Sequence, residues 1–189
     1  ICTCSGINKV SSLSMYYMSQ NMIRICFSLF IWMLSTANAA PVKAGQATVE
    51  LISETNAIVP GERFDVAVRF ELEPHWHIYW ENPGASGLAT TIDWTLPEGI
   101  EAGEIQWPAP ERISLGGMVN YGYEDEAVLI VTMQAADTLK VGENLSLQAD
   151  LFWLICKEAC LPGNASLQLE LPVAAAAVAG AEAAAFEVA

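Results

Sequence analysis

The strongest constraint on the fold is a closely spaced cysteine pair that lies between two segments of strand-like sequence. Residues 145–153 alternate between apolar and polar side chains before becoming wholly apolar, and residues 165–171 alternate again. A turn is predicted between them at residues 162–164, where the sequence is Pro-Gly-Asn. The second segment is therefore predicted to be the return strand. Cys156 is expected at the end of the first strand, and Cys160 in the turn or in one helical turn.

The spacing of Cys156 and Cys160 permits a disulfide and leaves three uses open. The Cα atoms of a disulfide are usually about 4.4–6.8 Å apart, whereas four residues of straight strand span about 13 Å, so the chain must turn between them. Closing a loop of about five residues stabilises a protein by about 2 kcal/mol, against about 4.7 kcal/mol for a hundred-residue loop. A redox-active pair is therefore favoured, and a structural disulfide or a metal site is the alternative.

Residues 22–39 are predicted to be a secretory signal peptide. They combine a basic start, a ten-residue apolar core and an Ala-x-Ala site, with cleavage expected between Ala39 and Ala40. Ten apolar residues are too few to span a bilayer. Residues 1–21 have no clear pattern and are interpreted as upstream, non-native sequence. Cleavage would remove Cys2, Cys4 and Cys26.

The charge of the mature chain limits its partners. From residue 40 onward the sequence contains 6 basic and 22 acidic residues, a net charge of −16. Nucleic-acid binding needs a basic surface, and anionic membranes repel an acidic one, so neither partner is predicted. Export would place the cysteine pair in an oxidising compartment, where disulfides persist. The domain is therefore predicted to be exported.

Residues 40–173 are predicted to form one all-β domain. Short strands are expected at residues 46–52, 64–72, 75–80, 91–96 and 127–133, in addition to the two around the cysteines. Turn signals separate them at residues 59–62, 82–87, 97–99 and 141–144. Many short strands with frequent turns are typical of a β-sandwich.

Residues 174–189 are rich in alanine, which occupies ten of the sixteen positions. Alanine favours helices, but the segment has few large apolar residues with which to dock. It is interpreted as a linker toward a missing membrane region, or as the start of a helix of a longer protein.

Two further groups of residues are candidates for binding. His75 and His77 would share one face of a strand and could bind copper or zinc, although two histidines alone do not make a site. The six tryptophans raise glycan binding as another alternative. No serine–histidine–acid set, phosphate-binding glycine loop or metalloprotease helix is found in the sequence.

The segment 106–123 is long and rich in glycine, proline and aromatic residues. Long loops of this composition are often functional. One expected use is a cap over the cysteine pair, and the alternative is an ordinary crossing between two sheets.

Five motifs taken together resemble the N-terminal periplasmic domain of the DsbD family, in particular its ScsB-like branch of protein-disulfide reductases with a cytochrome c biogenesis-type membrane region. The resemblance covers Gln46 to Val173. The motifs are His75–Gly84, Ile92–Gly99, Trp107–Arg112, Asn120–Tyr123 and Trp153–Pro162.

The resemblance implies an immunoglobulin-like β-sandwich with one redox-active pair, Cys156 and Cys160. Electrons would come from cytoplasmic thioredoxin through a membrane domain and a thioredoxin-like domain of the same reductase. The pair would pass them to periplasmic thioredoxin-fold proteins, such as disulfide isomerases or cytochrome c maturation thioredoxins. Cys160 is the better candidate for the mixed disulfide, and no cofactor is implied. The alternative is a secreted binding module for copper or a glycan with a structural disulfide.

The sequence also departs from the better-known members of this family. They space the two cysteines further apart, and their cap carries an aromatic shield. The candidates for the cap or for partner contacts here are Met118, Asn120, Tyr121 and Tyr123. No membrane segment or thioredoxin-like Cys-x-x-Cys follows residue 173. We therefore expect the chain to be a fragment of a larger reductase.

Overall fold

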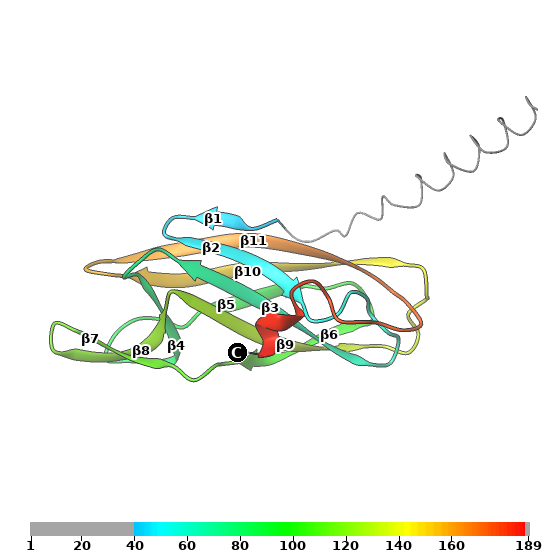
Figure 1. Ribbon diagram of the computed structural model, residues 1–189, viewed down its shortest axis with the longest axis horizontal. Helices are drawn as coiled ribbons and strands as arrows, with labels where there is room; N and C mark the ends of the chain where they lie inside the picture. Colours follow the sequence, from blue (N-terminus) through cyan, green and yellow to red (C-terminus); the bar gives the residue numbers. More distant parts are fainter. Residues whose placement is uncertain (1–39, 188–189) are drawn as a thin grey trace, which may run out of the picture. The chain divides into compact units, whose positions relative to one another are not determined.

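A computed structural model describes residues 40–187, which form two antiparallel β-sheets (Figure 1). The first sheet contains, in spatial order, β1 (Val42–Ala44), β2 (Ala47–Ser53), β3 (Arg63–Leu72), β9 (Glu126–Ala135) and β6 (Ile100–Gln106). The second contains β11 (Cys160–Pro172), β10 (Asn144–Cys156), β4 (His77–Gly84), β8 (Met118–Glu124) and β7 (Glu111–Leu115), and β5 (Thr91–Thr95) also pairs with β10. The predicted signal peptide at 22–39 and residues 1–21 lie outside the described residues.

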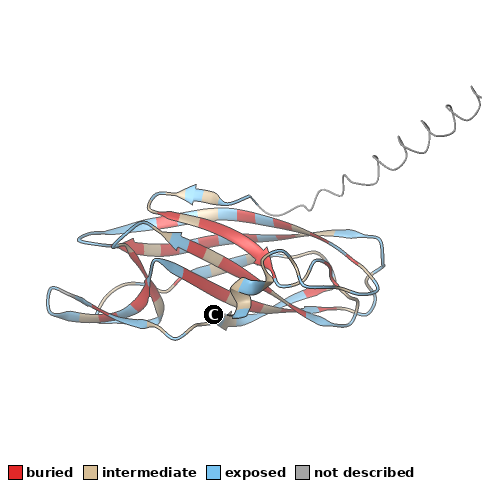
Figure 2. Cartoon of the chain, in the orientation of Figure 1, coloured by how far each residue is buried: buried red, intermediate tan, exposed pale blue. Residues whose placement is uncertain are grey.

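The core lies between the two sheets (Figure 2). Along β10 every second residue from Leu147 to Ile155 is buried, as expected for a strand with one face on the core. Phe70 of β3 meets Trp153 of β10 edge to face, with ring centroids 5.2 Å apart, so the two sheets share one core. The prediction of an all-β, immunoglobulin-like β-sandwich is confirmed.

The hairpin of β10 and β11 corrects the predicted turn. Pro162, Gly163 and Asn164 lie within β11, and the turn is residues 157–159. Gly163 lies opposite Trp153, where an added Cβ would lie 2.2 Å from Cε2 of the indole. The glycine is there to admit the tryptophan ring rather than to make a turn, and Pro162 is tolerated because β11 is the edge strand of its sheet.

The predicted loop at 106–123 is mostly a β-hairpin. Residues 107–110 cross from β6 in one sheet to β7 in the other, and β7 then pairs with β8 across a turn at Gly116 and Gly117. The predicted loop at 82–87 is likewise partly strand, because β4 continues to Gly84. Strands β1, β6, β7 and β8 were not predicted.

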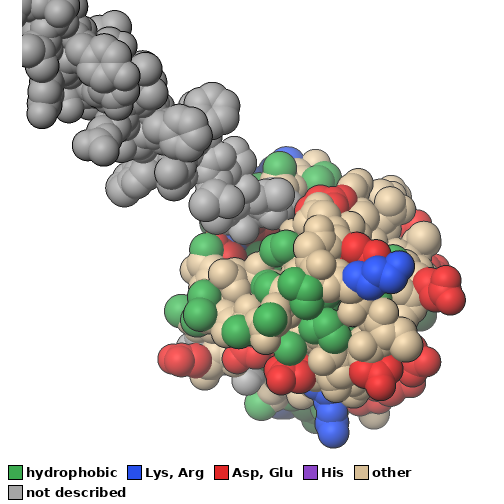
Figure 3. Space-filling model, turned by 90° about the vertical axis from the view of Figure 1, so that its right-hand side faces the viewer, with side chains coloured by type: hydrophobic (Ala, Val, Ile, Leu, Met, Phe, Trp, Pro, Cys, Tyr) green, Lys and Arg blue, Asp and Glu red, His purple; other side chains and the backbone are tan. Residues whose placement is uncertain are grey.

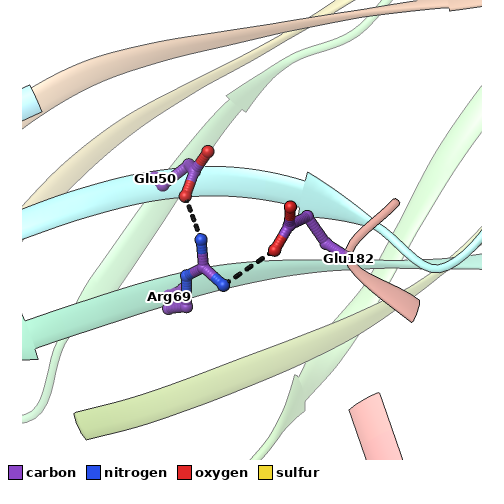
Figure 4. A network of polar contacts seen from close by, with 3 residues as sticks. All are labelled: Glu50, Arg69 and Glu182. Carbon is purple, nitrogen blue, oxygen red and sulfur yellow. Dashed lines mark hydrogen bonds and ion pairs between the residues drawn. The ribbon is translucent and has the colours of Figure 1, made fainter. Parts of the chain in front are cut away.

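The alanine-rich segment packs against the first sheet as far as the described residues extend. The amide of Gly180 donates to the Glu54 carbonyl at 2.7 Å, and Arg69 of β3 pairs with both Glu50 and Glu182 (Figure 4). The segment ends in a 3₁₀ helix, η1 (Ala183–Glu187), whose Phe186 covers an outer apolar cluster. The members of this outer cluster are Ile52, Ala67 and Val128. The interpretation of residues 174–189 as a linker toward further segments stays a prediction, but the described part of the segment packs on the domain.

The two ends of the sandwich differ. The turn between β10 and β11 lies at one end, and the loop after β11 reaches toward the other (Figure 1). Hydrophobic side chains gather on the second end (Figure 3). Val141 and Val178, in loops before β10 and after β11, are among the exposed large hydrophobic residues. Within residues 40–187, no helix has both the length and the hydrophobicity to cross a bilayer.

Candidate functional site

A disulfide joins Cys156 to Cys160 at the end of the β10–β11 hairpin. Cys156 ends β10 and Cys160 begins β11, and the two residues are opposite each other in the strand register with Cα atoms 4.1 Å apart. Within the turn, the Lys157 amide donates to the Ala159 carbonyl at 3.2 Å. The predicted position of Cys156 is therefore correct, whereas Cys160 lies in the return strand and not in a turn or helix.

The two cysteines differ in their access to solvent. Cys156 is only 1% exposed, whereas Cys160 is exposed. A thiolate must reach a sulfur along the line of the S–S bond to exchange with it, so access decides which sulfur is attacked. An incoming thiolate can reach Cys160, and Cys156 can act only from within the protein.

The disulfide lies on the outer face of its sheet. Ile155 of β10 and Ile78 of β4 are opposite each other and belong to the core between the sheets. Side chains alternate along a strand, so the next pair, Cys156 and His77, points to the opposite face. Tyr79 also lies on this face, two residues beyond His77. None of these three belongs to the core cluster.

The hydroxyl of Tyr79 touches both sulfurs. It donates a hydrogen bond to Cys156 Sγ at 3.0 Å and lies 3.6 Å from Cys160 Sγ. Burial raises the pKa of Tyr79, and a hydrogen bond with Ser86 partly opposes this. The hydroxyl therefore keeps its proton near neutral pH and remains a donor to whatever form the Cys156 sulfur takes.

A loop after β4 covers the ring of Tyr79. Gly87 has a φ of +102°, and an added Cβ would lie 2.3 Å from Tyr79 Cε1. Only glycine combines this backbone conformation with so close an approach. Asn120 holds the loop, because its Oδ1 accepts hydrogen bonds from the amide and the hydroxyl of Ser86 at 3.0 and 3.2 Å. Asn120 thus holds the loop that covers Tyr79, and its predicted role as a cap or partner-contact residue stays a prediction.

The other cap candidates have contacts elsewhere. Met118 and Tyr121 are exposed on β8, and Tyr121 packs edge to face on Trp80 at 6.3 Å. Tyr123 is buried and donates to the Pro108 carbonyl at 2.9 Å, and burial raises its pKa. In the described part of the chain, no hydrogen bond or aromatic contact joins these three to the sulfurs. Their role in shielding or partner contact stays a prediction.

His77 lies beside the disulfide and lines a groove of about 420 Å³ on the outer face. Its ring meets Tyr79 edge to face at 5.3 Å. Burial lowers the pKa of His77, and the Glu124 carboxylate opposes this shift. The residues that line the groove with His77 come from the turn, β7, β8 and the segment before β4: His75, Glu111, Arg112, Ile113, Ser114, Glu124, Lys157 and Glu158.

His75 and His77, the residues of the metal alternative, both line this groove but do not share one strand. His75 precedes β4 and has a φ of +69°, so the prediction that the two histidines share one face of a strand is wrong. Among residues 40–187 there is no group of three or more His, Cys, Asp or Glu residues arranged to hold a metal ion.

Sequence reasoning missed Tyr79, which contacts the disulfide, and Glu124, which lies opposite His77. The alternation in His77-Ile78-Tyr79 could have placed Tyr79 on the face of His77. Glu124 has no such signal, because its position opposite His77 depends on the pairing of β4 with β8.

Removing the Tyr79 hydroxyl is expected to make the disulfide harder to reduce. A thiolate accepts a stronger hydrogen bond than a disulfide sulfur does, so the hydroxyl favours the reduced state. With a difference of about 1 kcal/mol, Tyr79→Phe should lower the reduction potential by roughly 20 mV at about pH 10, above the ordinary thiol range, where Cys156 is ionised. Equilibration in dithiothreitol buffers measures this shift, with Tyr121→Phe as the control. A potential that rises or stays unchanged would contradict the prediction.

The sequence profile of the family described as "Thiol:disulfide interchange protein DsbD, N-terminal" matches residues 48–172. No curated protein matches the chain.

Solved structures of similar fold include the N-terminal periplasmic domain of ScsB from Proteus mirabilis. That structure has a TM-score of 0.57 and 23% sequence identity over 81% of this chain. The match spans 56% of the ScsB chain, a little over half of its length. The N-terminal domain of DsbD from Neisseria meningitidis in the reduced form is also similar, with a TM-score of 0.35 and 16% identity, over 68% of this chain and 89% of that one.

Proposed function

The chain belongs to the family of DsbD N-terminal domains, and from this premise we propose that the Cys156–Cys160 pair carries out thiol–disulfide exchange with periplasmic partner proteins. Cys160 forms the mixed disulfide and Cys156 resolves it. One observation supports this assignment above all: one sulfur is exposed and the other is buried within a single short disulfide.

The position of the disulfide supports exchange over a structural role. The bond joins two residues that the β-hairpin already holds opposite each other. Closing so short a loop stabilises the fold by about 2 kcal/mol at most. A disulfide that adds little restraint can open and close while the sandwich persists.

The proposed partners follow from the family and from the chemistry of the site. The pair receives electrons from a thioredoxin-like domain of the same reductase and passes them to periplasmic thioredoxin-fold proteins, of the disulfide isomerase or cytochrome c maturation type. Both are dithiol proteins, so each step is a disulfide exchange that needs no cofactor. The whole reductase would be a protein-disulfide reductase in the inner membrane.

The proposed segment boundaries give each part of the chain a role. Residues 22–39 direct export and are removed, residues 40–173 form the exchange domain, and residues 174–189 lead toward a membrane region. The name of the Proteus mirabilis ScsB domain calls that protein periplasmic, which supports the same location for this one.

The reduction potential of the pair tests the proposed function. The experiment uses the full chain with Cys2→Ser, Cys4→Ser and Cys26→Ser, termed the reference chain, so that only the pair titrates. The reference chain is equilibrated in glutathione or dithiothreitol buffers, and free thiols are trapped and counted. We expect a potential between about −270 and −180 mV, the range of thioredoxin-like relay proteins. Circular dichroism should show the same fold in both states.

A structural disulfide would behave differently. Its potential would lie below about −300 mV, or the fold would be lost on reduction. Either result would overturn the exchange proposal and return attention to a binding module with a structural disulfide.

A further inference from the structure

The strand register places four reactive side chains in one row across the outer face of the second sheet. Cys160 of β11 is opposite Cys156 of β10, Cys156 is opposite His77 of β4, and His77 is opposite Glu124 of β8. Residues opposite each other in a sheet point to the same face, with Cβ atoms about 4.5–5.5 Å apart. The row therefore runs disulfide, imidazole, carboxylate.

His77 has no other assigned use in the structure. Its side chain is 2% exposed, and Nε2 is buried with no hydrogen-bond partner among the described residues. An unpartnered buried polar atom is costly, so it persists where a function requires it. On one side, His77 is next to the buried Cys156, whose sulfur accepts a hydrogen bond from the Tyr79 hydroxyl.

We propose that His77 accepts the proton of Cys156 when this cysteine resolves a mixed disulfide, and that the carboxylate of Glu124 balances the charge of the resulting imidazolium. The inference rests on the proposed function, because it assigns a residue to the second step of the exchange.

The partner is bound to Cys160 through a disulfide, and Cys156 is a thiol. The proton of the Cys156 thiol moves to His77, and the resulting thiolate attacks Cys160 Sγ. A Cys156–Cys160 bond forms, the bond from Cys160 to the partner breaks, and the partner leaves as a thiolate. The pair is oxidised and the partner disulfide is reduced.

The surroundings of His77 suit a base. Burial disfavours a thiolate at Cys156, so this thiol needs a proton acceptor more than an exposed one does. Burial also keeps His77 neutral near pH 7, because it lowers the imidazole pKa while Glu124 opposes the shift. Once protonated, the imidazolium faces more negative than positive side chains. The charged or titratable groups around it are Glu124 on β8, Glu111 and Arg112 on β7, Lys157 and Glu158 in the turn, His75 before β4, Cys156 on β10 and Tyr79 on its own strand.

Two-phase kinetics can separate the step that involves His77, the attack by Cys156, from the first attack by Cys160. The reduced reference chain is mixed with 5,5′-dithiobis(2-nitrobenzoate), and release of the coloured thiolate is followed by stopped flow. The first equivalent reports attack by Cys160, and the second reports resolution by Cys156. In His77→Gln we expect an unchanged first phase and a second phase slowed at least about tenfold at pH 7, since general-base catalysis commonly contributes more than this.

The pH profile distinguishes a base from a structural role. Above the ordinary thiol range, near pH 10, Cys156 ionises without help, so His77→Gln and the reference chain should converge. Glu124→Gln should slow the second phase less than His77→Gln does. His75→Gln is the matched control, because His75 lies outside the row, and it should match the reference chain throughout.

Each outcome decides the inference. A second phase that is unchanged in His77→Gln, or a loss that is equal in both phases or at every pH, would overturn it. If His77→Gln does not fold, the reference chain alone decides. Its second phase should level off once His77 is neutral, below the ordinary imidazole pKa because burial lowers the pKa of His77. A rate that instead climbs to the thiol range would refute the base. Failure of the proposed function would give another result. The first phase, attack by Cys160, would then be slow in the reference chain and in every variant.

Discussion

Replacing Cys160 with serine is expected to reduce thiol–disulfide exchange to background, whereas Cys156→Ser should trap the partner in a covalent complex. The reason is the difference in access, with Cys160 exposed and Cys156 1% exposed. Only the exposed thiolate can attack a partner disulfide, and only the buried one is held beside it to complete the reaction. A serine hydroxyl replaces neither thiolate.

The measurement uses reduced Cys156→Ser and Cys160→Ser in the reference chain, each mixed with oxidised thioredoxin as the probe. Non-reducing electrophoresis and mass spectrometry should find a one-to-one adduct through Cys160 in Cys156→Ser and none in Cys160→Ser. Circular dichroism checks that both variants stay folded. An adduct that forms in Cys160→Ser instead would reverse the assigned order of attack and remove the reason for a base beside Cys156.

The parts of the fold that sequence predicts are the strands with one face on the core. Such strands alternate, and β2, β3 and β10 were predicted for this reason, whereas β9 was predicted from its strongly apolar sequence. β6 was missed because only Ile100 at its start is buried and the next residues are exposed, so the period is hidden. β8 was missed because its glycine resembles a turn signal. An added Cβ at Gly122 would lie 2.0 Å from the Ile78 carbonyl oxygen, so this glycine serves strand packing.

The same distinction explains what was predicted of the site. Cys156 and Cys160 stand out in the sequence because of their own chemistry and spacing. The residues around them do not stand out in this way. Tyr79 reaches the disulfide, and Glu124 reaches His77, only because strands far apart in the chain pair with each other. His77 was noticed, but as a metal ligand, because its partner in the sequence was another histidine. In the structure its partners are a cysteine and a carboxylate.

The stability of the domain should depend on Trp153 far more than on the disulfide three residues away. Trp153 is fully buried, meets Phe70 edge to face, and fills the space left by Gly163. Trp153→Ala is expected to lower the free energy of unfolding by about 3–5 kcal/mol. Phe152→Ala is the matched control, because Phe152 is adjacent, aromatic and 40% exposed. Its cost should stay below about 1 kcal/mol.

Guanidinium unfolding of the oxidised reference chain and of both variants measures these losses, and unfolding of the reduced reference chain supplies the decisive comparison. Reduction should cost about 2 kcal/mol or less, because the disulfide restrains a loop of five residues that the hairpin already closes. A sandwich held by its core can therefore exchange its disulfide and remain folded. If reduction costs more than Trp153→Ala, the disulfide is a structural one, and exchange is not its function.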